Sequence, residues 1–110
     1  MLITDEKIGD VVVLKLKGRL DASSAPKLKE QVKSLIGNDR HELVIDFAEV
    51  DFIDSSGLGV LVSSHRSVNR AGGDIRLSAL QDRVRAVVEL TRLHYVFEIF
   101  EDAVTAAESF

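Results

Sequence analysis

Short apolar runs alternate along this chain with segments whose apolar residues recur every three or four positions. The runs are typical of β-strands and stand at residues 2–8, 11–16, 43–47, 75–78 and 95–100. Strands that alternate with helices over brief connections favour an α/β sheet whose crossover connections are parallel and right-handed. A chain of 110 residues has room for one such domain, residues 1–110, and for no second one.

Two of the expected strands carry features that indicate their place in the sheet. Gly9-Asp10 separates the first two runs and is a turn pair that folds them back antiparallel, so the chain should open with a hairpin. The run at 43–47 is apolar except for Asp46, as expected of a strand that is covered on both faces. The fold predicted is a mixed β-sheet opened by an antiparallel hairpin, with about four helices packed along it.

Serines mark the expected starts of the first and third helices. The Ser23-Ser24 pair offers an N-cap to the first helix, and Pro26 fits its first turn. Ser78 and Gln81 have capping-box spacing, which predicts that the third helix begins there. The chain should close with a short helix near residues 103–110.

Charge and composition exclude several kinds of function. The chain has 14 basic and 18 acidic residues, a net charge of −4, and no Lys/Arg cluster of the kind that nucleic-acid binding needs. Its longest apolar stretches are a fraction of the ~20 residues that span a bilayer, and its N-terminus lacks a signal-peptide core. The absence of cysteine excludes disulfides, thiolate metal ligands and thiol nucleophiles. We therefore expect a soluble, cytoplasmic protein that binds neither membrane nor nucleic acid.

The segment that joins the third strand to the second helix is dense in acids and small residues: Asp51-Phe52-Ile53-Asp54-Ser55-Ser56-Gly57-Leu58-Gly59-Val60-Leu61. Ser55 or Ser56 can cap the helix, which places a hydroxyl beside unpaired N–H groups and the positive end of the helix dipole. A phosphate would be tolerated there. Gly57 and Gly59 each cost about 0.5–1 kcal/mol relative to alanine in a helix, and close approach by another surface is the natural reason for them.

The second helix should run from Ser55 to about Arg70, where Gly72-Gly73 closes it. Its apolar stripe consists of Leu58, Leu61, Val62 and Val68. A helical projection turns another set of residues away from that stripe: Gly59, Val60, Ser63, Arg66, Ser67 and Arg70. Val60 would then be an apolar residue facing outward, on a face that could lie flat against a partner while the arginines pair with its acids.

At these residues the chain resembles a known family, the STAS-domain antagonists of anti-sigma factors. The family hallmark Asp-Ser-Ser-Gly-Leu-Gly stands at Asp54 to Gly59, and the similarity covers nearly the whole chain. Further matching segments occur in order: Gly18-Arg19-Leu20-Asp21, Gly72-Gly73, Leu90-Thr91-Arg92-Leu93 and Phe97-Glu98-Ile99-Phe100. Arg19 departs from the pattern, because relatives often carry an acid at this position.

The resemblance implies a binding protein switched by phosphorylation, not an enzyme. In the family, an anti-sigma factor with serine kinase activity phosphorylates the first serine of the motif, here Ser55, and a metal-dependent serine phosphatase restores it. The unphosphorylated form captures the anti-sigma factor and frees the sigma factor. The chain itself is expected to be a monomer or weak dimer. The expected partner-binding residues are Asp21, Asp54, Ser56, Gly57, Leu58, Gly59, Val60, Ser63, Arg66 and Ser67.

Plainer interpretations of single residues remain open at this point. Ser55 could be nothing more than an N-cap. Asp54 could simply satisfy turn amides, or it could orient the serine or hold a metal bound to the kinase. Asp21 could merely terminate the preceding strand, or it could lie beside the phosphorylated loop as the family pattern implies.

Other functions compete with the antagonist hypothesis. A STAS domain could serve another signalling or transport assembly that has no sigma factor, and a small hydrolase or nucleotide-binding enzyme could be built around Ser55. The sequence holds no phosphate loop, catalytic lysine or nucleophile elbow to support an enzyme. The three histidines are far apart, and His65 falls on the apolar stripe of its helix, so it is expected to be a core residue. We expect no metal and no cofactor.

Overall fold

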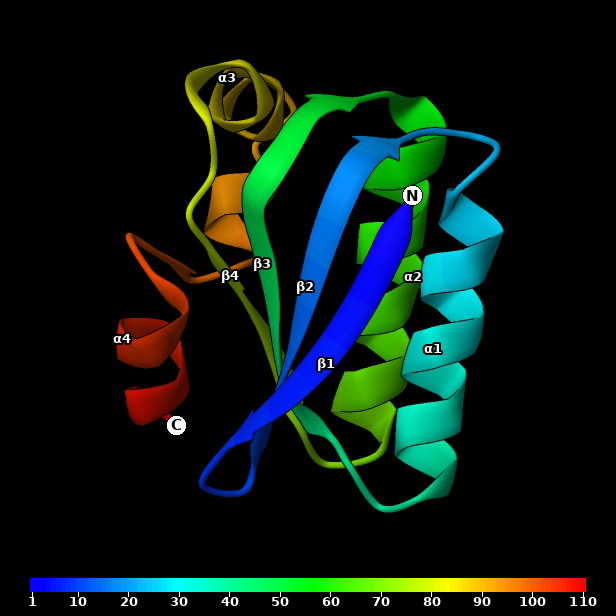
Figure 1. Cartoon of the computed structure of the whole chain (residues 1–110), viewed down its shortest axis with the longest axis vertical. Helices are drawn as coiled ribbons and strands as arrows, with labels where there is room; N and C mark the ends of the chain where they lie inside the picture. Colours follow the sequence, from blue (N-terminus) through cyan, green and yellow to red (C-terminus); the bar gives the residue numbers. More distant parts are fainter.

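Five strands form one mixed sheet in the order β1-β2-β3-β4-β5, as the computed structural model shows for all residues 1–110 (Figure 1). β1 pairs antiparallel with β2, and every later pair of neighbouring strands is parallel. This confirms the predicted mixed sheet with an antiparallel opening hairpin. The strands are β1 Leu2–Ile8, β2 Val11–Leu20, β3 Glu42–Ile53, β4 Asp74–Ser78 and β5 Ile99–Phe100.

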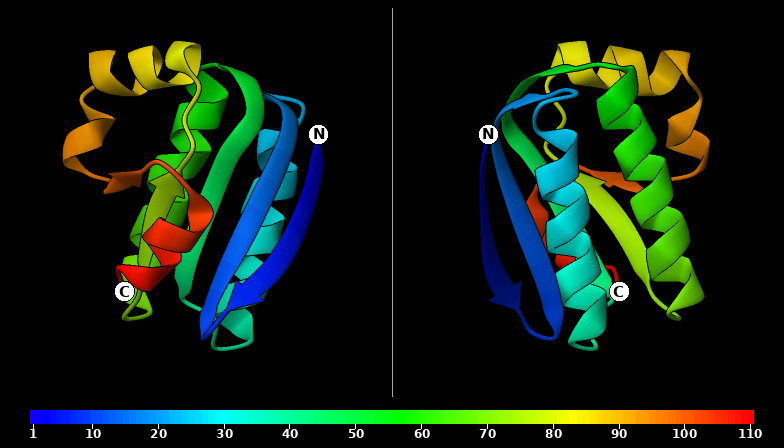
Figure 2. Two further views of the ribbon diagram at one scale, coloured as in Figure 1. Left: turned by 60° about the vertical axis from the view of Figure 1, so that its left-hand side comes forward. Right: turned by 90° about the vertical axis from the view of Figure 1, so that its right-hand side faces the viewer.

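Helices cover both faces of the sheet. α1 and α2 lie side by side on one face, α4 lies on the other, and α3 crosses the end of the sheet (Figure 2). None of these helices is long and apolar enough to cross a membrane. The helices are α1 Ala25–Gly37, α2 Ser55–Arg70, α3 Asp82–Leu90 and α4 Ala103–Glu108, with a 3₁₀ turn at Leu93–Tyr95.

The central strand, β3, is buried over much of its length because helices cover both faces of the sheet. In β3 every residue from Leu43 to Phe47 is buried, which confirms the prediction of a strand covered on both faces. Most of the core lies between the sheet and the helices α1, α2 and α3, while a smaller cluster lies under α4. Asp46 is the one polar residue of this run, and its carboxylate accepts a hydrogen bond from the Ala48 N–H at 2.9 Å.

The hairpin turn and the second helix lie where the sequence predicts them. Gly9 has φ +62°, which a glycine adopts without steric penalty, and the strands on either side pair from Ile8↔Val11 outward. Strands β2 and β3, however, run beyond the predicted segments, to Leu20 and Ile53, with irregular register along the way. These extensions carry both strand ends to the same edge of the sheet, directly before α1 and α2.

The prediction of a final strand over residues 95–100 is wrong for most of its length. Only Ile99–Phe100 pair with β4, and the preceding residues form the 3₁₀ turn and an irregular loop. Phe97 is 2% exposed in the main core while its neighbours Tyr95 and Val96 are exposed. Burial of that one aromatic ring bends the chain inward, so the segment cannot lie extended along the sheet edge.

The predicted capping box at Ser78 is wrong, and the predicted cap of the first helix is confirmed in position but not in its side-chain bond. Ser78 ends β4, and α3 begins four residues later after Gln81, whose side-chain amide donates to the Ala48 carbonyl at 2.8 Å. Ser24 is the N-cap residue of α1, as predicted, but its hydroxyl donates to the Arg19 carbonyl at 2.6 Å and makes no capping bond to the helix. In both cases a side chain at the start of the helix bonds to a strand, β3 for Gln81 and β2 for Ser24.

Candidate functional site

The candidate site lies at the edge where β2 and β3 end together. Leu20 pairs with Ile53, and the Asp54 N–H donates to the Leu20 carbonyl at 3.3 Å. Asp21 and Asp54 therefore follow adjacent strand ends, and α2 begins one residue later at Ser55. The carboxyl ends of parallel strands are where α/β sheets most often place their functional residues.

Asp54, not Ser55 or Ser56, is the N-cap of α2. It has an extended backbone, φ −117° and ψ −171°, and its Oδ1 accepts a hydrogen bond from the Gly57 N–H at 3.0 Å. The predicted serine cap is wrong because the preceding carboxylate already binds that amide. Ser55 is thus the first residue of the helix, exposed to solvent, with a hydroxyl that the cap does not use.

Removing this cap should loosen the start of α2 measurably. We expect Asp54→Ala to lower the free energy of unfolding by about 1 kcal/mol, since substitutions of capping Asp by Ala typically cost about that much. Asp54→Asn should retain most of the stability because an amide oxygen can accept the same bond. Urea denaturation of the three chains measures this, and equal losses for Ala and Asn would show that charge, not capping, is the function of this carboxylate.

Asp21 organises the turn that leads from β2 into α1. Its Oδ1 accepts hydrogen bonds from the Ser23 hydroxyl at 2.6 Å and from the Ser23 N–H at 3.0 Å. These bonds, the hydroxyl's first, hold the pKa of the Asp21 carboxyl below its ordinary value against the opposing effect of partial desolvation. Asp21 both ends its strand and, through the pairing of Leu20 with Ile53, stands at the edge that carries Ser55.

A lowered carboxyl pKa makes stability depend on pH in the acid range. The contribution of Asp21 is present above the ordinary pKa of 3.8 and is lost as the pH falls through the lower value of the folded state. We expect the stability difference between the unchanged chain and Asp21→Asn to shrink as the pH falls below about 4. Urea midpoints at several acid pH values measure it. Ser23→Ala removes the hydroxyl that donates to Asp21, so the stability of this variant should depend less on pH in the acid range than that of the unchanged chain. A stability difference between the unchanged chain and Asp21→Asn that did not vary with pH would contradict this account.

Cations from β2 lie against the acidic second half of β3, which the sequence of that segment alone does not show. Lys17 Nζ is 3.6 Å from Glu49, Arg19 Nε is 3.7 Å from Asp21, and the Arg19 guanidinium lies 3.9 Å from the centre of the Phe52 ring. The segment from Asp46 to Asp54 contains no Lys or Arg, but strand pairing supplies them from the neighbouring strand. Because these pairs are exposed, each contributes little to stability.

The prediction that Val60 faces outward is wrong. Its side chain is 6% exposed and belongs to the main core. The helical projection assumed one covered face, whereas α2 packs both on the sheet and on α1, so the buried arc is wider. The residues that α2 buries are Gly57, Val60, Leu61, Ser64 and Val68, and the predicted stripe residues Leu58 and Val62 are only half-buried.

Gly57 allows the close approach of another surface, as expected, and that surface is the fold's own pair of strand ends. A Cβ at this position would lie 2.6 Å from the Leu20 carbonyl oxygen and 2.8 Å from Ile53 Cγ1. A Cβ at Gly59 would have no atom within 4 Å. The first glycine of the motif therefore lets α2 start against the paired strand ends, and the second leaves the outer face of the helix flat.

Eight of the ten predicted partner-binding residues remain at least partly exposed. Ser56, Gly59, Arg66 and Ser67 are exposed, as is the predicted phosphorylation site Ser55, and Asp21, Asp54, Leu58 and Ser63 are half-buried. The sequence interpretation missed α1, whose first turns line a shallow hollow with Ser56, Gly59 and Ser63. On that side the hollow is lined by Ala22 before α1 and by Ala25, Pro26 and Lys29 of α1.

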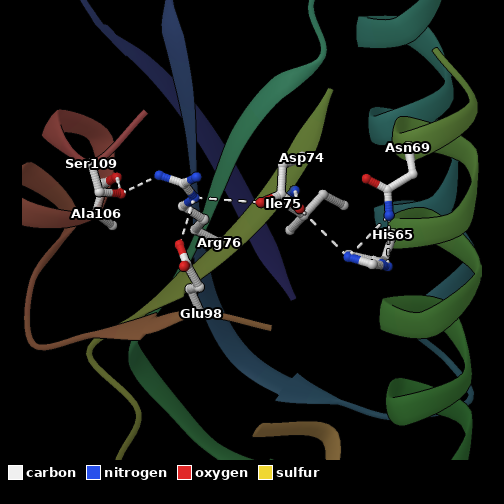
Figure 3. A network of polar contacts seen from close by, with 8 residues as sticks. All are labelled: His65, Asn69, Asp74, Ile75, Arg76, Glu98, Ala106 and Ser109. Atoms are coloured by element: carbon white, nitrogen blue, oxygen red, sulfur yellow. Dashed lines mark hydrogen bonds and ion pairs between the residues drawn. The ribbon is translucent and has the colours of Figure 1, made fainter. Parts of the chain in front are cut away.

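His65 is held by structural contacts, in line with the expectation of a core histidine, although it is half-buried. Its Nε2 lies 3.5 Å from Asp74 Oδ1, and its ring meets Phe97 edge-on at 4.8 Å between centres. Asp74 also pairs with Arg76, which pairs in turn with Glu98 (Figure 3). This chain of contacts joins α2 to β4 and to the segment before β5, away from the Ser55 edge.

Fold and site together define a small α/β domain that presents a helix N-terminus with a free serine at the carboxyl edge of a mixed sheet. The STAS domain model matches residues 3–106, and the chain belongs to this family. An anti-sigma-B factor antagonist of Listeria monocytogenes is 34% identical over 94 residues, 86% of this chain and 82% of the relative.

Solved structures show the same fold. An anti-sigma factor antagonist from Mycobacterium paratuberculosis superposes with a TM-score of 0.88 at 24% identity, covering 98% of this chain and 92% of that one. A sulfate transporter family protein from Wolinella succinogenes superposes with a TM-score of 0.81 at 18% identity, covering 93% and 85%. The fold alone is thus shared with proteins of a different kind, so the function must be argued from the site.

Proposed function

We propose that this chain is a non-enzymatic, cytoplasmic anti-sigma-factor antagonist whose binding is switched off by phosphorylation of Ser55. The observation that carries the proposal is the exposed Ser55 at the first position of α2, beside Asp54 and the strand end that carries Asp21. Supporting it, the Listeria relative that matches most of the chain is an anti-sigma-B factor antagonist. Ser55 opens the motif serine pair by which the chain resembles that family.

The proposed docking surface combines the Ser55 edge with the outer face of α2. Small residues at Ser56, Gly59 and Ser63 let another backbone come close, while Arg66 is exposed further along the helix to pair with acids of the partner. Val60 contributes from beneath by filling the space between α2 and α1, not by direct contact. The partner is an anti-sigma factor with serine kinase activity, and a metal-dependent serine phosphatase restores the hydroxyl.

A phosphate on Ser55 would act on the complex more than on the fold. It brings about −1.5 to −2 charges to the start of a helix, where the dipole favours an anion by about 0.3–1 kcal/mol. A unit-charge pair about 5 Å apart costs roughly 3 kcal/mol at an effective dielectric of 20, and Asp21 and Asp54 stand at the same edge. Water screens this repulsion in the free domain, whereas a docked interface removes the water.

Phosphopeptide mass spectrometry tests the modification directly. The chain is incubated with ATP and the anti-sigma factor from the same genome, and we expect phosphate on Ser55 only. Ser55→Ala should remain unmodified, while Ser56→Ala, the matched change one residue along the helix, should still be phosphorylated. Phosphate on Ser56 alone, or equal modification of Ser55→Ala, would place the switch elsewhere.

A STAS module of a signalling or transport assembly without a sigma factor is the second candidate. The fold shared with a sulfate transporter family protein favours it at the level of architecture only. Calorimetric titration of the unphosphorylated chain with the anti-sigma factor separates the two. Saturable one-to-one binding supports the proposal of an anti-sigma-factor antagonist. If an anti-sigma factor with kinase activity does not bind the chain, the result supports a STAS module of another assembly.

A further inference from the structure

A cavity of about 360 Å³ opens between α1 and α2, on the face of the molecule where the two helices lie side by side (Figure 2). Cations and hydroxyls dominate its lining: Lys29 and Lys33 from α1, and Ser63, Ser64, Ser67 and Arg70 from α2. The volume lies at the small end of the range for small-molecule sites. We call it the interhelical groove.

The charge of this groove is opposite to that of the chain. Lys29, Lys33 and Arg70 line it and no Asp or Glu does, although the chain has 18 acids and a net charge of −4. None of the three cations forms an ion pair with another residue of the chain. The nearby Lys27, by contrast, donates a hydrogen bond to the Met1 carbonyl at 2.9 Å. Three like charges around one hollow repel one another, and an anion bound between them relieves that repulsion.

Ser64 provides a second and independent sign of a ligand. Its side chain is 3% exposed, it lines the groove, and its Oγ has no hydrogen-bond partner in the protein. Nearly all buried polar atoms in native proteins have a partner, so an orphan hydroxyl requires an explanation. Its neighbour Ser63 does bond within the helix, to the Val60 carbonyl at 3.2 Å. The Oγ is covered in the free chain, so an oxygen of a bound anion would accept the Ser64 O–H once the side chain rotates toward the groove.

The floor of the groove is apolar, which narrows the class of ligand. Val32 is 2% exposed and Ile36 is half-buried, and the aliphatic stems of the two lysines extend that surface. A bare phosphate or chloride ion would leave these apolar side chains in contact with water. A ligand that also carries a compact apolar body would cover it and gain from the removal of water.

We propose that the interhelical groove binds a small molecule with a phosphate or carboxylate group on a compact apolar body. The anionic group lies between Lys33, Arg70 and the Ser64 hydroxyl, and the apolar body lies on Val32 and Ile36. This proposal goes beyond the proposed function and does not depend on it. Because Ser63 and Ser67 belong to the proposed docking surface as well, the experiment uses the isolated full chain without any partner.

Amide chemical-shift titration of the ¹⁵N-labelled chain is the test. Phenyl phosphate carries both features, phenylacetate replaces the phosphate by a carboxylate, inorganic phosphate lacks the apolar body, and benzyl alcohol lacks the charge. We expect saturable shifts confined to the groove for phenyl phosphate or phenylacetate, and weaker ones for the last two compounds. The stronger of the first two identifies the anionic group. No saturable shift up to about 10 mM, a concentration at which only very weak binding escapes detection, would overturn the proposal.

Charge variants separate a built site from general attraction to cations. Lys33→Gln with Arg70→Gln should weaken binding of the better probe about tenfold, equivalent to about 1.4 kcal/mol. Lys7→Gln with Arg83→Gln is the matched control, since it removes two exposed cations from β1 and α3 and should leave the affinity unchanged. Equal weakening by both pairs would reduce the effect to net charge and overturn the site.

Ser64→Ala tests the orphan hydroxyl without touching the charges. If the hydroxyl serves the ligand, the variant should bind the probe several-fold more weakly, while the melting temperature of the free chain stays the same or rises because an unpartnered buried hydroxyl has been removed. Unchanged affinity would show that Ser64 only fills space between the helices and would remove it from the site. If Ser64→Ala does not fold, the double variant Lys33→Gln with Arg70→Gln still tests the proposed site.

Discussion

Gly57→Ala is expected to lower the free energy of unfolding by about 3 kcal/mol, although alanine is the better helix former by about 1 kcal/mol. The added Cβ would lie 2.6 Å from the Leu20 carbonyl oxygen, 2.8 Å from Ile53 Cγ1 and 2.9 Å from Leu20 Cγ. One of these atoms is backbone and all three belong to paired strand ends, so none can swing aside as the end of a flexible side chain would. The start of α2 must move away from the sheet instead.

Gly59→Ala is the matched control, two residues further along the same helix. Its Cβ meets nothing within 4 Å, and its φ is not positive, so the substitution should stabilise the chain by about 0.5–1 kcal/mol. The same substitution at two positions of one helical turn thus changes the free energy of unfolding in opposite directions. The difference between the two changes measures how closely the helix approaches the strands.

Thermal unfolding, monitored by circular dichroism, tests the expected effects of the two glycine substitutions. A loss of about 3 kcal/mol lowers the melting temperature of a domain this size by roughly 15 °C, while the control should raise it by a few degrees. If both variants melted at the temperature of the unchanged chain, the contact between the start of α2 and the ends of β2 and β3 would be looser than the structure has it.

Local signals predicted the elements because each depends on residues close together in sequence. Gly9-Asp10 predicts the hairpin, the apolar run at 43–47 predicts the doubly covered strand, and the spacing from Ser55 to Arg70 predicts α2 with the observed bounds. Turn chemistry and periodicity act over a few residues, so one sequence suffices to read them. The position of Ser55 at the start of α2 follows from the same local information.

Most of the errors share one cause, which is that a neighbour distant in sequence changes the environment; the cap of α2 is the exception, because the adjacent Asp54 takes the place of the serines. Val60 is buried because α1 covers a second side of α2, and Arg19 lies against the end of β3 because β2 pairs with β3. Phe97 pulls the last predicted strand into the core. The spacing of the residues along the chain does not indicate any of these contacts. The sequence therefore predicts a docking face on α2, but it cannot predict which residues of that face are buried against α1.

Ser55→Asp is expected to weaken binding to the anti-sigma factor about 100- to 1000-fold while the domain stays folded. That loss corresponds to about 3–4 kcal/mol, the size expected when a charge is desolvated in an interface beside Asp21 and Asp54. Arg19 stands at this edge, but it is already engaged with Asp21 and Phe52, so it offsets little of the new charge. In the free domain an acid in the first turn of α2 is favourable, because it faces the positive end of the helix.

Thr105→Asp supplies the matched control for this prediction. Thr105 is exposed in the first turn of α4, on the opposite face of the sheet, so the variant adds the same charge within the first turn of another helix, far from the Ser55 edge. Calorimetric titration should give unchanged affinity for this variant and the predicted loss for Ser55→Asp, with similar melting temperatures for both. Equal weakening would attribute the effect to net charge. Retained affinity in Ser55→Asp would mean that the partner does not cover the start of α2, because a buried, unpaired carboxylate at that point could not be accommodated without cost.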